Sequence, residues 1–439
     1  MIVLKFGGTS VGDARRLKNL INLIQSEERR IVVLSAVSGT TNRLVDIAES
    51  LYKQQKTETC AKINALESEY VILANEIFDS TKKIEESHQL IAAHFSYLRG
   101  FNERAFTLLQ EKAVLAQGEL LSTALFQLLL EEHNIPSVLL PALDFMRIDK
   151  NLDPDEYYIK QNLNRLISQH PDIKLFITQG YICRNAYGEI DNLKRGGSDY
   201  TASLIGQAVM ADEIQIWTDI DGLHNNDPRF VENTSAVEEL SFDEAAELAY
   251  FGAKILHPSS ILPAKKANIP VLLKNSMRPE RLGTIIQNTN NKTGIKAIAA
   301  KDNITIIRIK SDRMLFAYGF LRKVFEVFEI YKTPIDMITT SEVAVSMSID
   351  DTSNLTEILK DLQKFGQTEV ESNQVIVALV GYIPTSENGY ASKIFEALLN
   401  IPIKMISYGA SNHNISILVD QKDKIAALNA LHQNLYVKI

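Results

Sequence analysis

Hydrophobic and polar positions along the first two thirds of the chain follow two alternating patterns. Ile2–Phe6 and Ile31–Leu34 are short, apolar and rich in β-branched residues, as buried parallel strands usually are. Between them, leucine and isoleucine recur at intervals of three and four residues over 17–24, which predicts an amphipathic helix. Strands and helical segments in alternation predict a mostly parallel sheet flanked by helices. Further strands are predicted at Ser137–Leu140, Leu175–Gln179, Ile214–Thr218 and Ile269–Leu273.

Helical patterns fill most of the intervals between these strands. Residues 43–133 are expected to be largely helical, with the polar stretch Thr57–His94 forming a helical excursion from the sheet. Ser241 and Glu244 have the spacing of a capping box, and the helix that they open is expected to continue to about His257.

The last third of the chain has a different texture. Thr289–Gly294 is polar and loop-like, which indicates a domain boundary. Beyond it, the order strand, helix, strand, strand, helix occurs twice, in units of roughly 65–70 residues. This rhythm predicts a duplicated α+β module whose second copy begins near residue 372.

Composition narrows the class of protein. The chain has 439 residues, enough for two or three domains, and its net charge of −8 argues against a nucleic-acid binder. Its two cysteines, Cys60 and Cys183, have no zinc-site spacing and fit a reducing compartment. No apolar run reaches the ~20 residues of a membrane span, and Met1 leads directly into a predicted strand without a leader peptide. A cytoplasmic location is expected.

The loop after the first strand, KFGGTSVG, carries candidate phosphate chemistry. Gly7 and Gly8 let the backbone bend sharply and bring N–H groups close to an anion, and Lys5 would supply a positive charge. The loop matches neither the dinucleotide fingerprint nor the Walker loop. Taken alone, it is more typical of a plain strand-to-helix turn beside a solvated lysine.

A second glycine-bearing loop, RGGSD at 195–199, precedes a helix predicted at Asp199–Val209. Backbone N–H groups at a helix start favour an anion, and Arg195 can hold a carboxylate through two parallel hydrogen bonds. Asp199 is suited equally to capping the helix and to catalysis. Because ligands of parallel sheets gather at the carboxyl ends of strands, the two loops together indicate a phosphate site.

A third polar segment follows the strand Ile214–Thr218. Thr218 and Asp219 are placed to meet a base or ribose, and Arg229 to meet a phosphate, although all three also suit a surface turn. Lys254, at the far end of the capped helix, would by itself complement the helix dipole and nothing more.

Together these segments resemble the aspartokinase family, and the matching motifs cover almost the whole chain in order. The motifs are KFGGTSVG (5–12), VVLSAVSGTTN (32–42), QGELLST (117–123), TQGY (178–181), RGGSDYTA (195–202), WTDIDG (217–222), NDPR (226–229), FGAKILHP (251–258), GFL (319–321), ITTSE (338–342) and ISYGASNHN (406–414). The resemblance implies ATP-dependent phosphorylation of the side-chain carboxylate of L-aspartate to 4-phospho-L-aspartate, with Mg²⁺ accompanying the nucleotide. This reaction begins lysine, threonine and methionine biosynthesis.

The resemblance also implies an architecture. An amino-acid-kinase fold is expected over 1–290, followed by two ACT-type modules over 296–372 and 373–439 that can exchange strands. A homodimer or larger homo-oligomer assembled through the ACT modules is expected. No homoserine dehydrogenase domain is expected, since the sequence ends at Ile439.

Position within the motifs implies a role for each candidate residue. Phosphoryl transfer is expected of Lys5, Gly7, Gly8, Asp199 and Lys254. ATP binding is expected of Lys5, Thr218, Asp219, His224, Arg229 and Lys254. L-Aspartate binding is expected of Ser35, Thr41, Glu119, Arg195, Ser198 and Asp199. No residue is assigned to a protein-bound metal. A feedback effector is expected to contact Met314, Leu315, Gly319, Phe320, Leu321, Asp336, Thr340, Ser341 and Glu342, which resemble the lysine-inhibited members of the family.

Two positions depart from the family pattern. His224 stands where such kinases often carry Tyr, so the contact with adenine can differ here. Ala317 stands where the lysine-inhibited members often carry Ser, which removes a possible hydrogen bond. The effector is therefore open between lysine, threonine and a weakly regulated state.

Two other functions are open to a chain of this kind. One is a kinase of the same fold acting on another amino acid, such as glutamate, against which Arg195 and Glu119 argue. The other is a catalytically silent amino-acid sensor, which would be expected to lack Lys5, Asp199 or Lys254, all of which are present.

Overall fold

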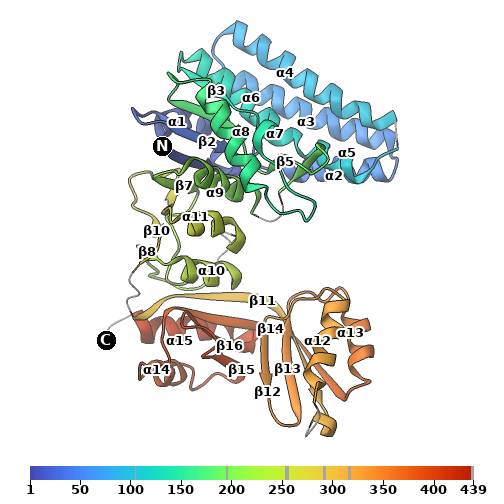
Figure 1. Cartoon of the computed structure of the whole chain (residues 1–439), viewed down its shortest axis with the longest axis vertical. Coiled ribbons are helices and arrows are strands. Elements are labelled where there is room, and N and C mark those ends of the chain that lie inside the picture. Colours follow the sequence, from blue (N-terminus) through green and yellow to red (C-terminus); the bar gives the residue numbers. More distant parts are fainter. Residues whose placement is uncertain (104, 194–195, 253–256, 290–292, 315–317, 437–439) are drawn as a thin grey trace. The chain divides into compact units, whose positions relative to one another are not determined.

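The computed structural model describes residues 1–103, 105–193, 196–252, 257–289, 293–314 and 318–436. The chain divides into two compact units. The first unit is Met1–Leu223 with Leu256–Asn288, and the second unit is His224–Ile255 with Thr289–Ile439. Figure 1 shows the elements of both along the chain.

The first unit is built on the parallel sheet that the sequence predicts. Its strands lie in the order β3-β4-β2-β1-β7-β9-β10, and every neighbouring pair is parallel except the last, β9 with β10. The carboxyl ends of the parallel strands therefore meet at one edge. The strands are β1 (Ile2–Phe6), β2 (Arg30–Leu34), β3 (Ser137–Leu139), β4 (Leu175–Gln179), β7 (Glu213–Thr218), β9 (Val271–Asn275) and β10 (Thr284–Ile286), with a separate hairpin of β5 (Ile182–Arg184) and β6 (Ile190–Asn192).

Helices cover this sheet. They are α1 (Ala14–Ile24), α2 (Thr40–Tyr52), α3 (Lys56–Ile77), α4 (Thr81–Arg99), α5 (Leu108–Leu115), α6 (Gln117–Glu132), α7 (Ala142–Phe145), α8 (Glu156–Ser168), α9 (Gly197–Val209) and α11 (Leu262–Ala267), with the 3₁₀ turns η1 (Gly8–Val11), η2 (Gly100–Glu103) and η3 (Pro258–Ile261).

The two faces of the sheet use alternate residues of each strand. Leu4 and Phe6 of β1 belong to the large core shared with α1, α2, α3, α4 and α6. Val3 and Val33, which point the other way, are also completely buried, and α9 packs with β1, α8 and α11. Burial on both faces explains why these strands are apolar without alternation.

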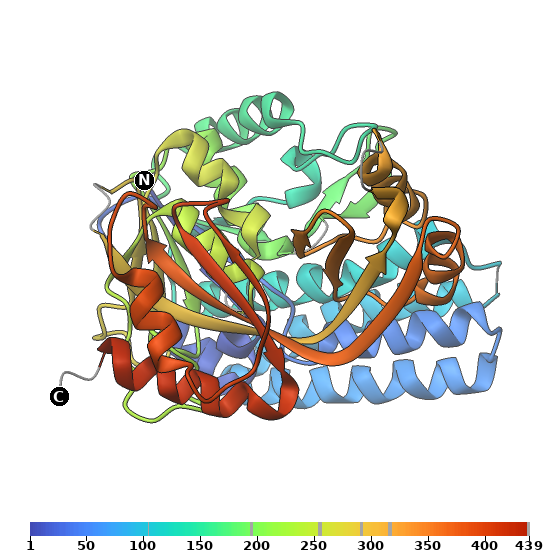
Figure 2. The same cartoon turned by 90° about the horizontal axis from the view of Figure 1, so that it is seen from below.

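The polar stretch Thr57–His94 is helical, as predicted, and lies within the long helices α3 and α4. These run side by side in both views (Figures 1 and 2). Only one stripe of α3 is buried, including Ile63, Leu66 and Tyr70, which explains its polar composition.

One described helical stretch, Leu108–Glu132, is long and apolar enough to cross a membrane by length and composition alone. Of its most apolar window, 78% is buried inside the fold, as expected of a core helix. Glu111, Lys112 and Glu119 interrupt the stretch, so it does not form the uninterrupted apolar run that the sequence analysis looked for.

The second unit is built on an antiparallel sheet with the strand order β12-β13-β11-β14-β16-β15. The strands of this sheet are β11 (Gly294–Lys310), β12 (Met337–Thr340), β13 (Ala344–Ile349), β14 (Gln367–Tyr382), β15 (Ile403–Tyr408) and β16 (Asn414–Asp420). The two-residue strand β8 (Glu239–Leu240) is not part of this sheet. Its helices are α10 (Phe242–Tyr250), α12 (Phe320–Ile330), α13 (Leu355–Leu362), α14 (Tyr390–Ala397) and α15 (Lys424–Tyr436), with the 3₁₀ turns η4 (Asp312–Met314) and η5 (Gln421–Asp423).

Two long strands join the halves of this sheet. β11 and β14 pair from Gly294 opposite Tyr382 to Lys310 opposite Gln367, and both extend across the sheet in Figures 1 and 2. One half of each strand packs in a core with α14 and α15, and β11 continues into a second core with α12 and α13. The sequence rhythm predicted the two halves but not the continuous strands.

The capping box at Ser241 and Glu244 is present, with both reciprocal hydrogen bonds. The predicted end of the helix is wrong, because α10 stops at Tyr250 instead of near His257. Gly252 has a φ of +114°, and a side chain there would lie 2.3 Å from the Ala300 carbonyl oxygen, so the chain turns sharply where the pattern suggested continuation. The predicted fold class, a parallel sheet flanked by helices followed by α+β modules, is confirmed.

Candidate active site

Lys5 lies on β1 between the neighbouring strands β2 and β7. After it, the Gly7 N–H donates to the Trp217 carbonyl at 3.3 Å, which holds the loop against β7. A Cβ on Gly7 would lie 3.3 Å from Lys5 Nζ, and a Cβ on Gly8 would lie 3.2 Å from the Ala36 carbonyl oxygen. The two glycines therefore leave room around the lysine and beside the next loop.

Lys5 is paired with Asp199 across the start of α9. Lys5 Nζ lies 2.7 Å from Asp199 Oδ1, and the two side chains are 12% and 13% exposed. The N-cap of α9 is Gly196, with a φ of +80°, so Asp199 is not the capping residue. The sequence left open whether Asp199 caps the helix or takes part in catalysis. In the structure its carboxylate pairs with Lys5 and does not cap α9.

A cavity of about 430 Å³, which we call the Glu119 cavity, lies at this carboxyl edge. Four of the residues predicted to bind aspartate line it, together with Gly8. The lining residues are Gly8, Thr9, Ser35, Ala36, Val37, Ser38, Gly39, Thr41, Glu119, Tyr181, Gly197 and Ser198.

Glu119, in the first turn of α6, is 4% exposed. Its Oε1 accepts a hydrogen bond from the Ala36 N–H at 3.3 Å, and its Oε2 has no hydrogen-bond partner among the described residues. Burial raises the pKa of the Glu119 carboxyl to about 7, against the opposing effect of the Ala36 N–H. A buried carboxylate oxygen that lies at a cavity and receives no hydrogen bond from the described residues is suited to binding an ammonium group.

The opposite wall of the Glu119 cavity is packed tightly. Ser35 Oγ donates to Ser198 Oγ at 2.9 Å. A Cβ on Gly180 would lie 2.4 Å from Ser198 Oγ, and a Cβ on Gly197 would lie 2.4 Å from the Tyr181 ring. Tyr181 has a φ of +65°. Its part in this wall was missed, since the TQGY motif gives no sign of a left-handed tyrosine in contact with the RGGSD loop.

Thr218 ends β7, and its carbonyl oxygen accepts a hydrogen bond from the Ser276 N–H at 2.8 Å. Thr218 Oγ1 donates to Asp219 Oδ1 at 3.1 Å, and the Ser276 and Ser10 hydroxyl oxygens are 2.8 Å apart. The loops after β1, β7 and β9 are thereby tied together. Ser10 and Ser276 were not predicted as site residues, because the order of the strands in the sheet, and not their own sequence motif, brings them together.

His224 and Arg229 belong to the second unit. His224 Nδ1 lies 2.9 Å from the Thr234 hydroxyl. Arg229 pairs with Asp227 at 2.6 Å, and these hydrogen bonds raise the pKa of the arginine.

The effector candidates in the second unit lie in or next to η4, α12 and β12. Gly319, with a φ of +79°, precedes α12, and Asp336 precedes β12. The Asp336 side chain is 1% exposed, pairs with Lys301 at 2.6 Å and accepts a hydrogen bond from the Tyr250 hydroxyl at 2.6 Å. The other described candidates are Met314 at the end of η4, Phe320 and Leu321 in α12, Thr340 at the end of β12, and Ser341 and Glu342 after it.

Several residues of the sequence analysis lie outside the described residues. They are Arg195, Lys254, Leu315 and Ala317.

The sequence and the fold of this chain are similar to those of known proteins. Residues 1–275 match the Amino acid kinase family and residues 377–435 match an ACT domain. The chain is 34% identical to the lysine-sensitive aspartokinase 3 of Escherichia coli over 99% of both chains. It is 33% identical to the chloroplastic aspartokinase 1 of Arabidopsis thaliana, over 99% of this chain and 80% of that protein.

Two solved structures of Escherichia coli aspartokinase III have the same fold. The complex with aspartate and ADP superposes with a TM-score of 0.83 and 33% identity, covering 99% of this chain and 100% of that one. The complex with lysine and aspartate gives a TM-score of 0.82 and 32% identity, covering 99% of each chain.

Proposed function

We propose individual roles for the residues of this chain, which belongs to the aspartokinase family and phosphorylates the side-chain carboxylate of L-aspartate with ATP. One observation carries the assignment. The Glu119 cavity combines the Ser35 and Ser198 hydroxyls with a buried carboxylate oxygen that has no hydrogen-bond partner among the described residues. Ser198 directly precedes Asp199, which is paired with Lys5.

Aspartate binding is assigned to the Glu119 cavity. Glu119 Oε2 would accept a hydrogen bond from the substrate ammonium group, which supplies a donor that this buried oxygen does not find among the described residues. The hydroxyls of Thr41 and Ser198 would donate to carboxylate oxygens, with Ser35 orienting the Ser198 hydroxyl through the hydrogen bond that it donates to it. Arg195 would hold the α-carboxylate through two parallel hydrogen bonds. A carboxylate for the ammonium and a guanidinium for the carboxylate select an amino acid over a plain dicarboxylic acid.

Phosphoryl transfer is assigned to the loop around Lys5. The side chain of aspartate ionises near pH ~3.9, so it is already a nucleophile at neutral pH and needs no general base. The barrier is the approach of an anion to a triphosphate. Lys5 and the Gly8 N–H would stabilise charge on the transferred group, while Gly7, whose N–H is bonded to Trp217, leaves room beside Lys5. Asp199 would position Lys5, and Lys254 would add a second cation.

The nucleotide is assigned to the same carboxyl edge of the parallel sheet, at the loop that follows β7. Thr218 and Asp219 follow β7, while His224 and Arg229 keep their assignment on their motif positions alone. Mg²⁺ is proposed to accompany the nucleotide, bound to its phosphate oxygens. Carboxylates such as Asp219 are oxygen donors of the kind that Mg²⁺ accepts, and the bound ion would neutralise phosphate charge.

Lysine is the proposed feedback inhibitor, acting through the ACT region. One relative supports this choice, the lysine-sensitive aspartokinase 3 of Escherichia coli, whose crystal structure has been solved with lysine and aspartate. The proposed contacts are Met314, Gly319, Phe320, Leu321, Asp336, Thr340, Ser341 and Glu342. Threonine is the alternative effector, because Ala317 removes a hydroxyl from the family pattern.

Three further proposals concern organisation. We propose a homodimer or larger homo-oligomer assembled through the ACT modules. We propose a cytoplasmic location, which fits the free thiols of Cys60 and Cys183. We also propose domains at 1–290, 296–372 and 373–439, with the qualification that β11 and β14 contribute a half to each ACT module.

The activity is tested by incubating the protein with ATP, Mg²⁺, L-aspartate and hydroxylamine, which traps an acyl phosphate as the hydroxamate. L-Aspartate should give product, and succinate and L-glutamate little or none. Folded protein that forms no hydroxamate would contradict the assignment. Arg195→Ala should mainly raise KM for aspartate, and titration with lysine and with threonine identifies the effector.

A further inference from the structure

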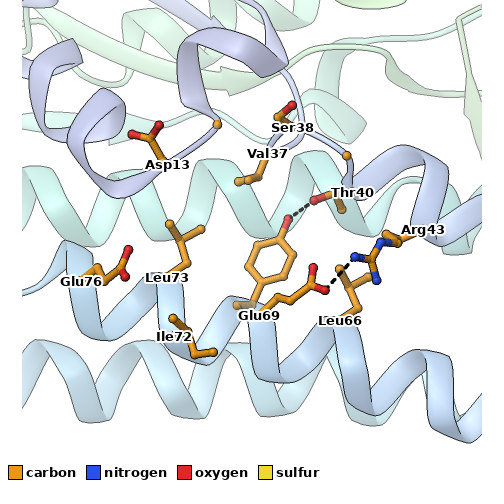
Figure 3. A pocket seen from close by; sticks show the side chains of 13 residues that line it. Asp13, Val37, Ser38, Thr40, Arg43, Leu66, Glu69, Ile72, Leu73 and Glu76 are labelled. Carbon is orange, nitrogen blue, oxygen red and sulfur yellow. Dashed lines mark hydrogen bonds and ion pairs between the residues drawn. The ribbon is translucent and has the colours of Figure 1, made fainter.

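The loop that forms one wall of the Glu119 cavity has open space on both sides. Val37, Ser38 and Gly39 line that cavity. The same three residues also line a second cavity of about 280 Å³, shown in Figure 3 and called here the Tyr70 pocket. Its remaining lining comes from Gly12, Asp13, Thr40, Arg43, Leu66, Glu69, Tyr70, Ile72, Leu73 and Glu76. Ser38 and Gly39 are exposed, whereas Ala36, Val37 and Thr40 on either side of them are buried, so the packing contacts of the loop lie at its two ends.

The helix that continues this loop has no side-chain cap. The N-cap of α2 is Gly39, with a φ of +83°, and it provides no side-chain hydrogen bond. The first turn is held by backbone bonds from the Thr40 N–H to the Val37 carbonyl and from the Arg43 N–H to the Gly39 carbonyl. An uncapped start is less constrained than one with a Ser, Thr, Asp or Asn cap. Its position therefore depends on tertiary contacts.

Tyr70 of α3 supplies such a contact. Its hydroxyl oxygen lies 2.8 Å from Thr40 Oγ1, in a hydrogen bond that either group can donate, drawn as a dashed line in Figure 3. Tyr70 and Thr40 are 3% and 4% exposed, so the bond is shielded from water. Burial raises the pKa of the Tyr70 hydroxyl, which keeps it protonated near neutral pH. Loss of either hydroxyl would leave the other buried without this partner.

The opposite side of the loop rests on α6. A Cβ on Gly118 would lie 2.8 Å from the Ala36 Cβ and 3.3 Å from a methyl carbon of Thr40. The next residue, Glu119, accepts the Ala36 N–H. The start of α2 is thus held between α6, which carries Glu119, and Tyr70 on α3. A shift of Thr40 would move Thr41 and the loop relative to Glu119.

We propose that Tyr70 is a positioning residue for aspartate, fixing through Thr40 the start of α2, which carries Thr41, and the loop before it. The proposal rests on the assignment of the Glu119 cavity to aspartate. It gives the α3–α4 excursion a function in substrate affinity. Among the described residues, the hydrogen bond of Tyr70 is made to Thr40 and its ring contact to Phe95, and neither partner is assigned to the nucleotide, so its effect is expected to be confined to aspartate.

Tyr70→Phe removes the hydroxyl and retains the ring. Steady-state kinetics in the hydroxamate assay should show KM for aspartate raised about fivefold to twentyfold, as expected for one lost buried hydrogen bond. The kcat and the KM for ATP should change less than about twofold. Thr40→Val should give the same result from the other side of the bond, and Thr40→Ser, which keeps a hydroxyl, should stay near wild type.

Tyr52→Phe is the matched control. Tyr52 lies at the far end of α2, and its hydroxyl donates to Glu111 Oε2 at 2.8 Å. Removal of this bond should leave KM for aspartate unchanged. Thermal unfolding of every variant separates altered affinity from loss of folded protein.

The double variant Tyr70→Phe/Thr40→Val completes the test. If the two side chains act through one bond, its KM should match that of either single variant. The proposal is overturned if the KM for aspartate is unchanged in Tyr70→Phe, if both substrates are affected equally, or if the single effects multiply. Should Tyr70→Phe fold poorly, the comparison of Thr40→Val with Thr40→Ser decides alone. A wild-type protein without hydroxamate activity would instead refute the proposed function.

Discussion

Substitution of Glu119 by glutamine tests the proposed ammonium contact through its dependence on pH. Burial raises the pKa of this carboxyl from its ordinary value of 4.5 to about 7. Below that pH the free enzyme carries a neutral acid at this position, which cannot form an ion pair with an ammonium group. The affinity for aspartate should therefore weaken as the pH falls through neutrality.

The size of the effect follows from the fraction of enzyme that is ionised. With a pKa of about 7, KM for aspartate should exceed its high-pH limit by about 1.1-fold at pH 8, about 2-fold at pH 7 and about 11-fold at pH 6. The Glu119→Gln variant has no ionisable group at this position. Its KM should be higher throughout and should lack this rise between pH 8 and pH 6.

The same carboxyl should affect stability with a defined sign. Because its pKa is raised in the folded state, the protonated form stabilises the fold fully below about pH 4.5, and this contribution is lost as the pH rises through about 7. The difference corresponds to about 3 kcal/mol. Glu119→Gln should therefore unfold at a higher denaturant concentration than wild type at pH 8, and with little advantage at pH 4.

Hydroxamate kinetics at pH 6, 7 and 8, with urea unfolding at pH 4 and 8, measure both effects. Glu58→Gln, an exposed substitution in α3, is the control and should follow wild type in every assay. A wild-type KM that is constant from pH 6 to 8 would refute the reasoning. So would the same rise in the Gln variant, because the titrating group would then lie elsewhere.

Three further substitutions probe other parts of the molecule. Lys5→Met should lower kcat at least about 100-fold with a smaller change in KM for aspartate, and near-normal kcat would remove this lysine from phosphoryl transfer. In Gly118→Ala the new methyl would come 2.8 Å from a neighbouring side-chain carbon, so the free energy of unfolding should fall by about 1–3 kcal/mol and KM for aspartate should rise. Gly100→Ala, where the new methyl meets open space, is the control and should change neither quantity. Lys301→Met leaves the Asp336 carboxylate, 1% exposed, without its cation and should destabilise the fold by about 3 kcal/mol in urea, and an unchanged midpoint would show that the pair adds nothing.

Much of the fold was predictable because it depends on local pattern. The apolar strands of the parallel sheet and the capping box at Ser241 rest on short stretches of sequence, and both are present. The end of α10 was not predictable. The helical pattern continues past Tyr250, and only the close approach of Gly252 to the Ala300 backbone, 48 residues later in the sequence, ends it.

The candidate site divides in the same way. Lys5, Glu119 and Asp199 were identified from motifs, and the structure brings Lys5 to Asp199 and places Glu119 at a cavity. Tyr181 and Ser276 were missed. Tyr181 takes part in the site through a backbone with positive φ, and Ser276 through a contact between loops with Ser10, and neither feature produces a recognisable sequence pattern. The motifs beside them indicated a turn in the chain but not its position in space.

The long strands β11 and β14 determine what can be separated from this protein. A fragment of residues 373–439 would keep β15, β16, α14 and α15 but would lack the β11 residues that pair with Ile376–Tyr382. Its inner strand would present an unpaired edge and an uncovered part of its core. The pair of modules is therefore one folding unit, and the shortest fragment expected to be independently stable begins before Gly294 and contains both halves of the sheet.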